Sequence, residues 1–265
     1  MRILQHNPSR NSLKERNLHP EYRGGYSRWL HRERLPVVHN RESRIRERMT
    51  TLQDQLDEIT AKTRQLVQAE RLAVSERAVE ELFASGIEER ILPVGALAPE
   101  FELYDATGRL VRSQDMLALG PLVIKFFRGR WCPYCVTELE TWRDLYGKLR
   151  EHEALMVAIG PQTERQSDFM AGQHSLPFPL LSDPGCALAE KFGLAYTVPE
   201  VLREHYLSIL INIPFVNGES SWRLPLPATY VISPAGRVLF AETHADFRVR
   251  PEPEEALAAF AQHSR

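Results

Sequence analysis

The chain has 265 residues, of which 43% are hydrophobic and 26% are charged, a composition typical of a globular protein with one ordinary domain plus appendages. The formal net charge of −2 gives no indication of a nucleic-acid partner or of an anionic membrane surface. No apolar run approaches the roughly 20 residues that cross a bilayer, and three cysteines are too few for a disulfide framework. We therefore expect a cytoplasmic protein without a secretory signal and without a membrane partner.

The segment 1–48 differs from the rest of the chain in charge. It holds twelve Lys and Arg against five Glu, a net charge of +7, so the remainder of the chain carries −9. Its sparse apolar residues and recurrent Pro and Gly predict a basic, disordered extension. Three interpretations stay open: a nucleic-acid arm, an organellar presequence, or a gene-model artefact with translation starting at Met49. We favour the last, because the first regular pattern begins at that residue.

Residues 49–92 carry apolar side chains at helical spacing with charges between them. The pattern predicts one long N-terminal helix that begins after Thr50 or Thr51, runs to about Ser85 and ends at Gly86. Such a helix packs either on the following domain or on a partner subunit. We expect a homodimer.

Residues 93–265 change to strands and turns alternating with helices. Strands are predicted over about 94–103, 110–111, 122–127, 154–159, 178–181, 229–232 and 238–241. Helices are predicted over about 133–149, 166–174, 186–192 and 254–263. Strands that alternate with helices and close in a hairpin and a helix predict a three-layer α/β domain.

The most informative stretch of this domain is a buried strand that leads into two cysteines. Leu122–Phe127 is a short apolar run, and Trp131-Cys132-Pro133-Tyr134-Cys135 follows it at the start of a helical pattern. Pro133 suits the first turn of a helix, where its missing N–H removes no hydrogen bond. The strand thus delivers Cys132 and Cys135 to a helix N-terminus, whose N–H groups and dipole favour a thiolate.

Two arginines add positive charge to this helix N-terminus. Arg128 and Arg130 flank the strand exit, so we expect a lowered pKa for Cys132 and a nucleophilic, solvent-reachable sulfur there. The two-residue spacing places Cys132 and Cys135 one helical turn apart, close enough for a disulfide. Two other interpretations stay open. A zinc site is one, although the sole other cysteine is the remote Cys186, and a pair of structural thiols is the other.

Several further residues have both a functional and a plain structural interpretation. Lys125 interrupts the apolar strand and either tunes a thiolate from below, lies at an edge or forms an internal ion pair. Trp131 either shields the cysteines or simply packs. Cys186 fits a small core or surface residue better than a remote resolving thiol. The apolar segment 195–227 is longer than the fold requires, and we expect it to border the Cys132 groove as a lid or a subunit interface.

Four segments together resemble the peroxiredoxin-like (AhpC/TSA, redoxin) family of the thioredoxin superfamily. VGALAPEFELYDATGRLV is similar to the family's opening strands, LVIKFFRGRWCPYCVTEL to its active-site strand and helix, FPLLSDPGCALAEKFGL to its middle segment, and LPATYVISPAGRVLF to its closing hairpin. The resemblance covers about residues 93–262 in consistent order. It implies a thioredoxin-like fold, with a central mixed sheet flanked by helices, and no cofactor.

The resemblance also exposes departures from ordinary peroxiredoxins, which carry P-x-x-x-T-x-x-C and an Arg in the closing hairpin. Aligned on that pattern, Cys135 occupies the peroxidatic position, Cys132 the Thr position and Arg128 the Pro position. The hairpin Arg position falls near Pro227. The motif W-C-x-x-C and Pro227 resemble a thioredoxin instead, in which that proline follows a cis peptide bond and faces the redox pair.

The family resemblance implies two mechanisms that end in the same Cys132–Cys135 disulfide. In one, a thiolate reduces a hydroperoxide through a sulfenic acid, with Arg128 or Arg130 polarising the peroxide. In the other, Cys132 attacks a substrate disulfide and Cys135 resolves the product, as in a protein disulfide reductase. Either needs an external thiol reductant such as the thioredoxin or glutathione system. A redox-regulated binding protein is the third hypothesis.

Overall fold

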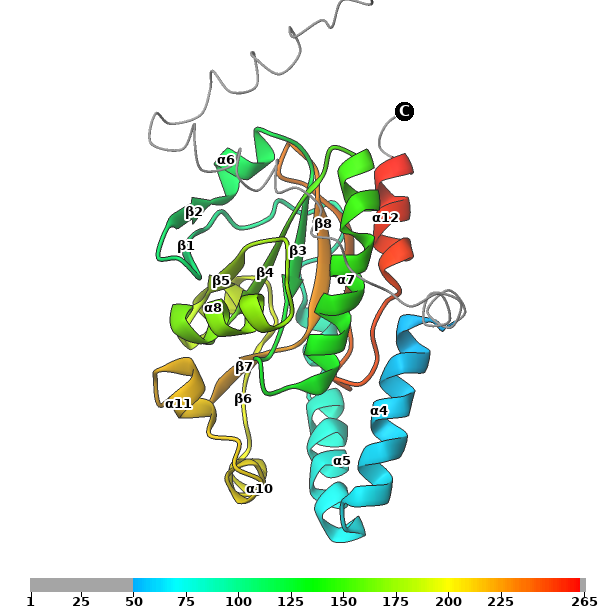
Figure 1. Ribbon diagram of the computed structural model, residues 1–265, viewed down its shortest axis with the longest axis vertical. Helices are drawn as coiled ribbons and strands as arrows, with labels where there is room; N and C mark the ends of the chain where they lie inside the picture. The colour runs from blue at the N-terminus through cyan, green and yellow to red at the C-terminus, as the bar shows by residue number, and fades with distance from the viewer. Residues whose placement is uncertain (1–49, 263–265) are drawn as a thin grey trace, which may run out of the picture.

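The computed structural model describes residues 50–262, so the predictions for residues 1–48 lie outside the described part of the chain (Figure 1). That part contains a seven-stranded sheet in the order β2-β1-β5-β4-β3-β8-β9. Strands β3, β4 and β5 run parallel, and the outer pairs are antiparallel. The strands are β1 Glu102–Asp105, β2 Leu110–Arg112, β3 Leu122–Phe126, β4 Leu155–Gly160, β5 Leu180–Ser182, β8 Ala228–Ile232 and β9 Val238–Thr243. The predicted mixed sheet of a thioredoxin-like α/β fold is confirmed.

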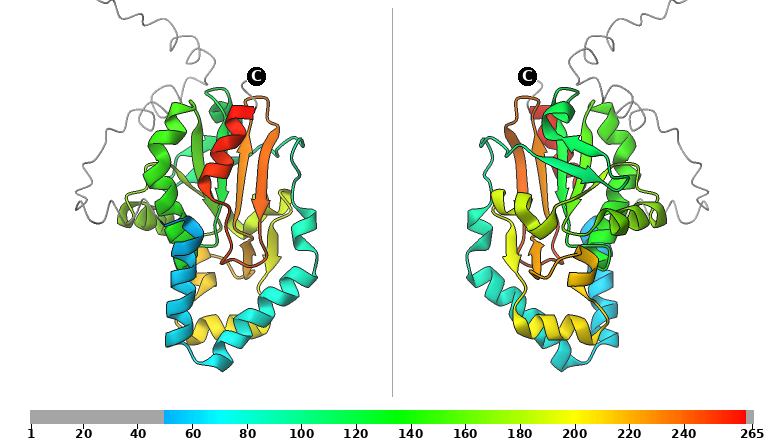
Figure 2. Two further views of the ribbon diagram at one scale, coloured as in Figure 1. Left: turned by 90° about the vertical axis from the view of Figure 1, so that its right-hand side faces the viewer. Right: turned by 90° about the vertical axis from the view of Figure 1, so that its left-hand side faces the viewer.

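Helices cover both faces of this sheet, which gives the predicted three layers (Figure 2). On one face lie α7 Pro133–Glu151, α8 Glu164–Gln173 and α12 Pro253–Gln262. On the other face lie η3 Ile87–Arg90, α6 Ser113–Leu117, η4 Pro184–Cys186 and α9 Ala187–Lys191. Most predicted boundaries agree with these within about three residues, but the strand predicted over 94–103 is wrong, because the first strand is β1 Glu102–Asp105 and the residues before it form turns and one isolated bridge at Leu97.

The alternation of side chains along the central strands separates two cores. In β3, Ile124 and Phe126 face the core under α9, whereas Val123 faces the core under α7. Because successive residues of a strand point to opposite faces, Lys125 shares the face of Val123 and points toward α7. The register of β3 therefore places a charged side chain beneath the cysteine-bearing helix.

The predicted single N-terminal helix is wrong, because the chain forms two helices that diverge from a break between them. Helix α4 Leu52–Leu66 ends at Val67, which has an extended backbone (φ −105°, ψ 135°), and α5 Ala69–Ala84 follows directly. The predicted start is confirmed, since Thr51 and Asp54 form a capping box. The predicted stop is also confirmed, because Gly86 has a φ of 67°. The break lets α4 pack on α7 while α5 packs on α10 Glu200–Ser208.

The long apolar segment before the closing hairpin forms a subdomain of its own. It contains the two-stranded sheet of β6 Ala195–Thr197 and β7 Arg223–Pro225. The helices α10 and α11 Ile213–Asn217 connect these two strands in the sequence. Its core includes Leu202 and Tyr206 from α10, with Ala78 from α5. Figure 2 shows α10 beside α5 at one end of the sheet. Within residues 50–262, no helix is both long and apolar enough to span a bilayer.

Candidate active site

The turn that follows β3 requires a glycine. Gly129 has a φ of 149°, a conformation that residues with a Cβ rarely adopt. A Cβ at Gly129 would lie 2.5 Å from the indole nitrogen of Trp131. This glycine therefore allows the chain to turn sharply from the strand into the cysteine motif, with Trp131 folded back over the turn.

The two cysteines lie at the N-terminus of α7 as the sequence predicts. Cys132 is the N-cap residue, and Pro133 occupies the first turn. Cys132 and Cys135 lie close enough for each side chain to affect the pKa of the other, and neither forms a disulfide. The expected solvent-reachable sulfur is wrong for this conformation, because Cys132 is 1% and Cys135 is 0% exposed. Both belong to the core that includes Leu52 and Leu56 of α4, the helix that covers this end of α7.

The electrostatic environment favours ionisation of Cys135, not of Cys132. Burial alone would raise the pKa of Cys135, but the hydrogen bond from Cys132 and the charges of Arg250 and Arg128 lower it to about 6. Burial, and the proton held between the two sulfurs, raise the pKa of Cys132 well above its ordinary value. The predicted lowering of the Cys132 pKa is therefore wrong. Of the two thiols, Cys135 is therefore the one whose ionisation this environment favours.

A buried ion-pair network lies beneath Cys135. The Glu138 carboxylate, one helical turn after Cys135, lies 2.5 Å from Lys125 Nζ and accepts a hydrogen bond from Arg250 Nε at 2.9 Å. Lys125 also donates to the Thr229 hydroxyl at 3.0 Å, and all three charged side chains are fully buried. Arg250 Nη2 reaches Cys135 Sγ at 4.0 Å. Of the interpretations of Lys125, the internal ion pair is confirmed, and burial lowers the pKa of this lysine despite the Glu138 charge.

The position of Arg250 depends on the helix at the opposite end of the chain. Glu252, two residues after Arg250, accepts hydrogen bonds from the N–H groups of Leu52 and Gln53 at 2.9 and 3.0 Å. These are first-turn donors of α4 that lack partners within the helix. The side chain of Gln53 in turn accepts from the Arg250 N–H at 3.3 Å. Sequence reasoning missed Arg250, because no local pattern marks it. It also missed Glu138, although a charged residue three positions after Cys135 on the buried helix face was a usable signal.

Arg128 lies on the other side of the thiols, stacked between aromatic rings. Its guanidinium carbon is 4.2 Å from the ring centre of Phe247 and 4.9 Å from that of Trp131. One of its terminal nitrogens donates to the Tyr206 hydroxyl. Arg128 is 1% exposed, and its charge acts on both Cys132 and Cys135.

The segment 195–227 does border the cysteines, as predicted. Tyr206 of α10 stacks on Trp131 with ring centres 5.3 Å apart, and it bonds to Arg128. Trp131 is packed against the cores on both sides, that of the cysteines and that of α10. Trp131 and Tyr206 thus pack on each other beside Arg128, which is consistent with either shielding of the thiols or plain packing.

The two remaining predicted site residues, Arg130 and Pro227, have partners other than the cysteines. Arg130 turns toward α8, where its side chain donates to Gln166 and stacks on Phe169 at 5.1 Å. Pro227 is buried at the start of β8, and the cis bond implied for Leu226–Pro227 is wrong, because that bond is trans in the described chain. Pro227 instead accepts a hydrogen bond from the Thr243 hydroxyl at 2.8 Å.

Cys186 lies in the opposite core from the other two cysteines. It is fully buried among apolar side chains at the start of α9, and burial raises its pKa. This confirms the interpretation as a small core residue. Within residues 50–262, no three His, Cys, Asp or Glu side chains are grouped so as to hold a metal ion.

Comparison with known proteins identifies residues 94–241, more than half of the chain, as a segment of the AhpC/TSA family. The chain belongs to this AhpC/TSA family. The resemblance drawn from the sequence motifs is thereby confirmed, and the matched segment contains both cysteines but neither α4, α5 nor Arg250.

Individual members of the AhpC/TSA family resemble this chain over its central part. Peroxiredoxin Bcp of Bacillus subtilis is 30% identical over 103 residues, which are 39% of this chain and 65% of that protein. Thiol-disulfide oxidoreductase ResA of Bacillus cereus is 27% identical over 107 residues, 40% of this chain and 61% of that protein. The crystal structure of peroxidoxin BcpB from Mycobacterium tuberculosis matches with a TM-score of 0.51 at 25% identity, covering 65% of this chain and 98% of that chain. The matches cover just under two thirds of Bcp and ResA, and they place this chain among thiol-dependent oxidoreductases.

Proposed function

We propose that this protein reduces hydroperoxides, with Cys135 as the attacking thiolate and Cys132 as the resolving thiol. The Cys135 sulfur attacks one peroxide oxygen, the O–O bond breaks, and the alkoxide or hydroxide leaves with a proton as an alcohol or water. Cys135 is then a sulfenic acid. The sulfur of Cys132 attacks it, water is released, and the Cys132–Cys135 disulfide forms. An external dithiol, such as thioredoxin, or two glutathione thiols restore both cysteines by exchange.

The observation that carries this proposal is the distribution of charge around the two sulfurs. Arg250 and Arg128 both act on Cys135, and the Cys132 thiol donates a hydrogen bond to it, so the pKa of Cys135 falls to about 6. This lowering favours the thiolate form of Cys135 near neutral pH. A resolving cysteine that stays protonated until the sulfenic acid forms suits Cys132, whose pKa is raised.

Arg128 is the better of the two predicted arginines for polarising the peroxide. Its guanidinium acts on both thiols, whereas the side chain of Arg130 is engaged with Gln166 on α8. A guanidinium next to the thiolate can stabilise the negative charge that develops on the leaving oxygen. In this proposal Arg128 replaces the hairpin arginine of ordinary peroxiredoxins.

Burial favours a peroxide over a protein disulfide as the oxidising substrate. A peroxide needs a passage the width of a small molecule, whereas a protein disulfide needs a groove, and Cys132 is 1% exposed. In this proposal Trp131 and Tyr206, which pack on each other beside Arg128, act as a lid that moves when the external thiol reduces the disulfide. The disulfide-reductase hypothesis therefore requires a larger opening before the first step.

The test is peroxide consumption by the full-length protein, coupled to the thioredoxin or the glutathione system. Cys135→Ser should abolish turnover, whereas Cys132→Ser should consume about one equivalent of peroxide and stop. A sulfenic-acid probe should label Cys135 in that variant, which mass spectrometry can locate. Cys186→Ser is the control and should retain turnover.

Other outcomes would support the competing functions. If Cys132 alone were labelled, or if only Cys135→Ser kept single-turnover reactivity with a disulfide substrate, the reductase mechanism would replace this proposal. Absence of turnover with both peroxide and disulfide substrates would favour the redox-regulated binding protein.

A further inference from the structure

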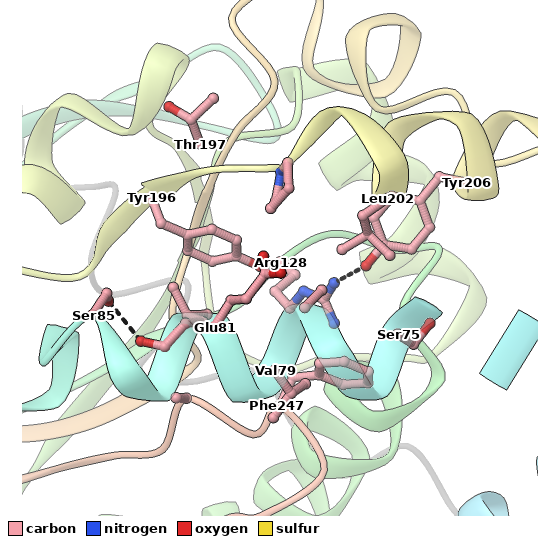
Figure 3. Close-up of a pocket in the computed structure, with 14 residues that line it drawn as sticks. Ser75, Val79, Glu81, Ser85, Arg128, Tyr196, Thr197, Leu202, Tyr206 and Phe247 are labelled. Carbon is pink, nitrogen blue, oxygen red and sulfur yellow. Dashed lines mark hydrogen bonds between the residues drawn. The ribbon is translucent and has the colours of Figure 1, made fainter. Parts of the chain in front are cut away.

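A pocket between α5 and α10 reaches the Arg128 side chain (Figure 3). Its volume is about 150 Å³, and a dry cavity of about this size holds a molecule as large as benzene. Apolar side chains form most of its wall, namely Ala78, Val79, Leu82, Leu202 and Phe247. One wall is therefore α5, which lies outside the segment shared with the AhpC/TSA family.

Arg128 at the base of this pocket lacks a full set of partners. Its Nε has no hydrogen-bond partner, although the side chain is 1% exposed. Among residues 50–262, no Asp or Glu forms an ion pair with it. A guanidinium stays protonated in proteins, and a buried charge without a counter-ion is destabilising. Its planar fork matches a carboxylate, which accepts two parallel hydrogen bonds.

Few groups around Arg128 can supply a compensating negative charge. Tyr196 and Tyr206 face it, but burial raises the pKa of both hydroxyls, so they stay neutral. Glu81 lines the pocket from α5 and is exposed to solvent. The Cys132 and Cys135 sulfurs are the remaining groups that interact with the guanidinium charge. Arg128 therefore shares its charge with the thiolate and loses that counter-charge when the thiolate is consumed.

We propose that this pocket binds a compact apolar carboxylate of about six carbons, its head on Arg128 and its body between α5 and α10. We further infer that it binds more tightly when the cysteines carry no thiolate. A thiolate and a carboxylate compete for one guanidinium, and such coupling between two sites is reciprocal, typically about 5- to 150-fold. Binding itself is independent of the peroxidase proposal, and only tighter binding to the disulfide form rests on it.

Isothermal titration of the full-length, reduced protein with hexanoate tests the site. Acetate carries the head alone and hexan-1-ol the body alone, so both should bind at least about tenfold more weakly than hexanoate. Arg128→Met should abolish hexanoate binding, whereas the matched control Arg130→Met should leave it intact. Because Arg128 is buried, Val79→Trp on α5 provides a second variant that fills the pocket and should also abolish binding. Hexanoate binding that is unchanged in Val79→Trp would overturn the site.

The competition with the thiolate is tested by two further preparations. One is the Cys132→Ser/Cys135→Ser double variant, and the other is protein oxidised with one equivalent of hydrogen peroxide. Both should bind hexanoate about tenfold more tightly than the reduced protein. Equal affinity in the double variant and the reduced protein would overturn the competition. If the double variant binds more tightly but peroxide forms no disulfide, the peroxidase proposal fails while the carboxylate site stands.

Discussion

Cys135 and Cys186 are both fully buried, but they lie on opposite faces of the same sheet and differ in acidity. The core around Cys186 is apolar, and burial raises the pKa of its thiol. The core around Cys135 contains Lys125, Glu138 and Arg250, and the pKa of its thiol falls to about 6. Burial alone therefore raises the pKa of a thiol, whereas the same burial beside guanidinium groups and a neighbouring thiol lowers it, which is the change that the proposed nucleophile needs.

The comparison also separates two uses of a buried charge. The Glu138 carboxylate neutralises Lys125 and one side of Arg250, which leaves the other side of the guanidinium for Cys135 at 4.0 Å. Without Glu138, the Arg250 guanidinium would lose the carboxylate that fixes its position in this core. Glu138 thus orients Arg250, which gives Cys135 an acidity that Cys186 lacks.

The largest effect should come from removing the charge that distinguishes Cys135 from Cys186. In Arg250→Met we expect the pKa of Cys135 to rise by about 1–3 units, the usual influence of a nearby opposite charge. Because about half of Cys135 is ionised at pH 6 when its pKa is about 6, the second-order rate constant with hydrogen peroxide at that pH should fall by roughly fivefold to 500-fold. Thiolate absorbance at 240 nm across a pH titration measures the pKa, and stopped-flow kinetics measure the rate. Arg248→Met is the matched control, since Arg248 pairs with Asp246, and an equal loss there would contradict the role of Arg250.

Replacing a single charged residue of the core around Cys135 with an apolar one should destabilise the fold. Glu138→Leu leaves Lys125 and Arg250 without their carboxylate, and we expect a loss of about 3–5 kcal/mol in the free energy of unfolding. Lys125→Met should be less harmful, because Glu138 keeps its bond to Arg250. Urea unfolding of both variants gives the two values. A smaller loss for Glu138→Leu than for Lys125→Met would mean that the carboxylate is not the centre of the network.

The lowered pKa of Cys135 should make the unfolding free energy of the protein rise with pH. Since its pKa is lower in the folded than in the unfolded protein, ionisation stabilises the fold fully above the ordinary thiol pKa of about 8.5. This stabilisation is lost as the pH falls to about 6. Between these limits the unfolding free energy of wild type minus that of Cys135→Ser should rise by up to about 1.4 kcal/mol per pH unit. The raised pKa of Cys132 acts in the opposite direction but only above the ordinary thiol pKa. Urea unfolding at pH 6, 7 and 8 measures the slope, and a flat difference would show that Cys135 is not ionised.

The smallest effect should come from changes at Cys186. Cys186 should not react with iodoacetamide at pH 7 in the folded protein and should react once urea unfolds the chain. Cys186→Ala should lower the unfolding free energy by about 1 kcal/mol and leave the peroxide rate unchanged, because it removes one small buried group. Alkylation of Cys186 at a rate close to that of Cys135 would remove the contrast between the two cores.

The sequence predicts the scaffold well because local patterns specify it. The apolar length of β3 and the position of Pro133 correctly predict a strand that delivers two cysteines to a helix N-terminus. The break between α4 and α5 escapes prediction, since helical spacing continues through Val67 without Pro or Gly. The packing of α4 on α7 and of α5 on α10 decides it.

The acidity of the two cysteines could not be predicted from the motif alone. Helix dipole and nearby arginines argued for Cys132, which is the residue closest to the helix start. The deciding guanidinium belongs to Arg250, which follows Cys135 by 115 positions and has no sequence signal. The ion pair between Glu138 and Lys125 could have been predicted from the sequence, because the two residues carry opposite charges on a buried helix face and a buried strand.

The hydrogen bonds from the first turn of α4 to Glu252 join the two ends of the described chain next to Arg250, the residue that contacts Cys135. A fragment trimmed to the family segment 94–241 would keep both cysteines and lose the guanidinium of residue 250 together with the helix that anchors it. Shortened versions, or fusions that disturb either terminus, should therefore have thiols that react slowly, even where the sheet forms correctly. Engineering of this enzyme has to begin from the longer chain.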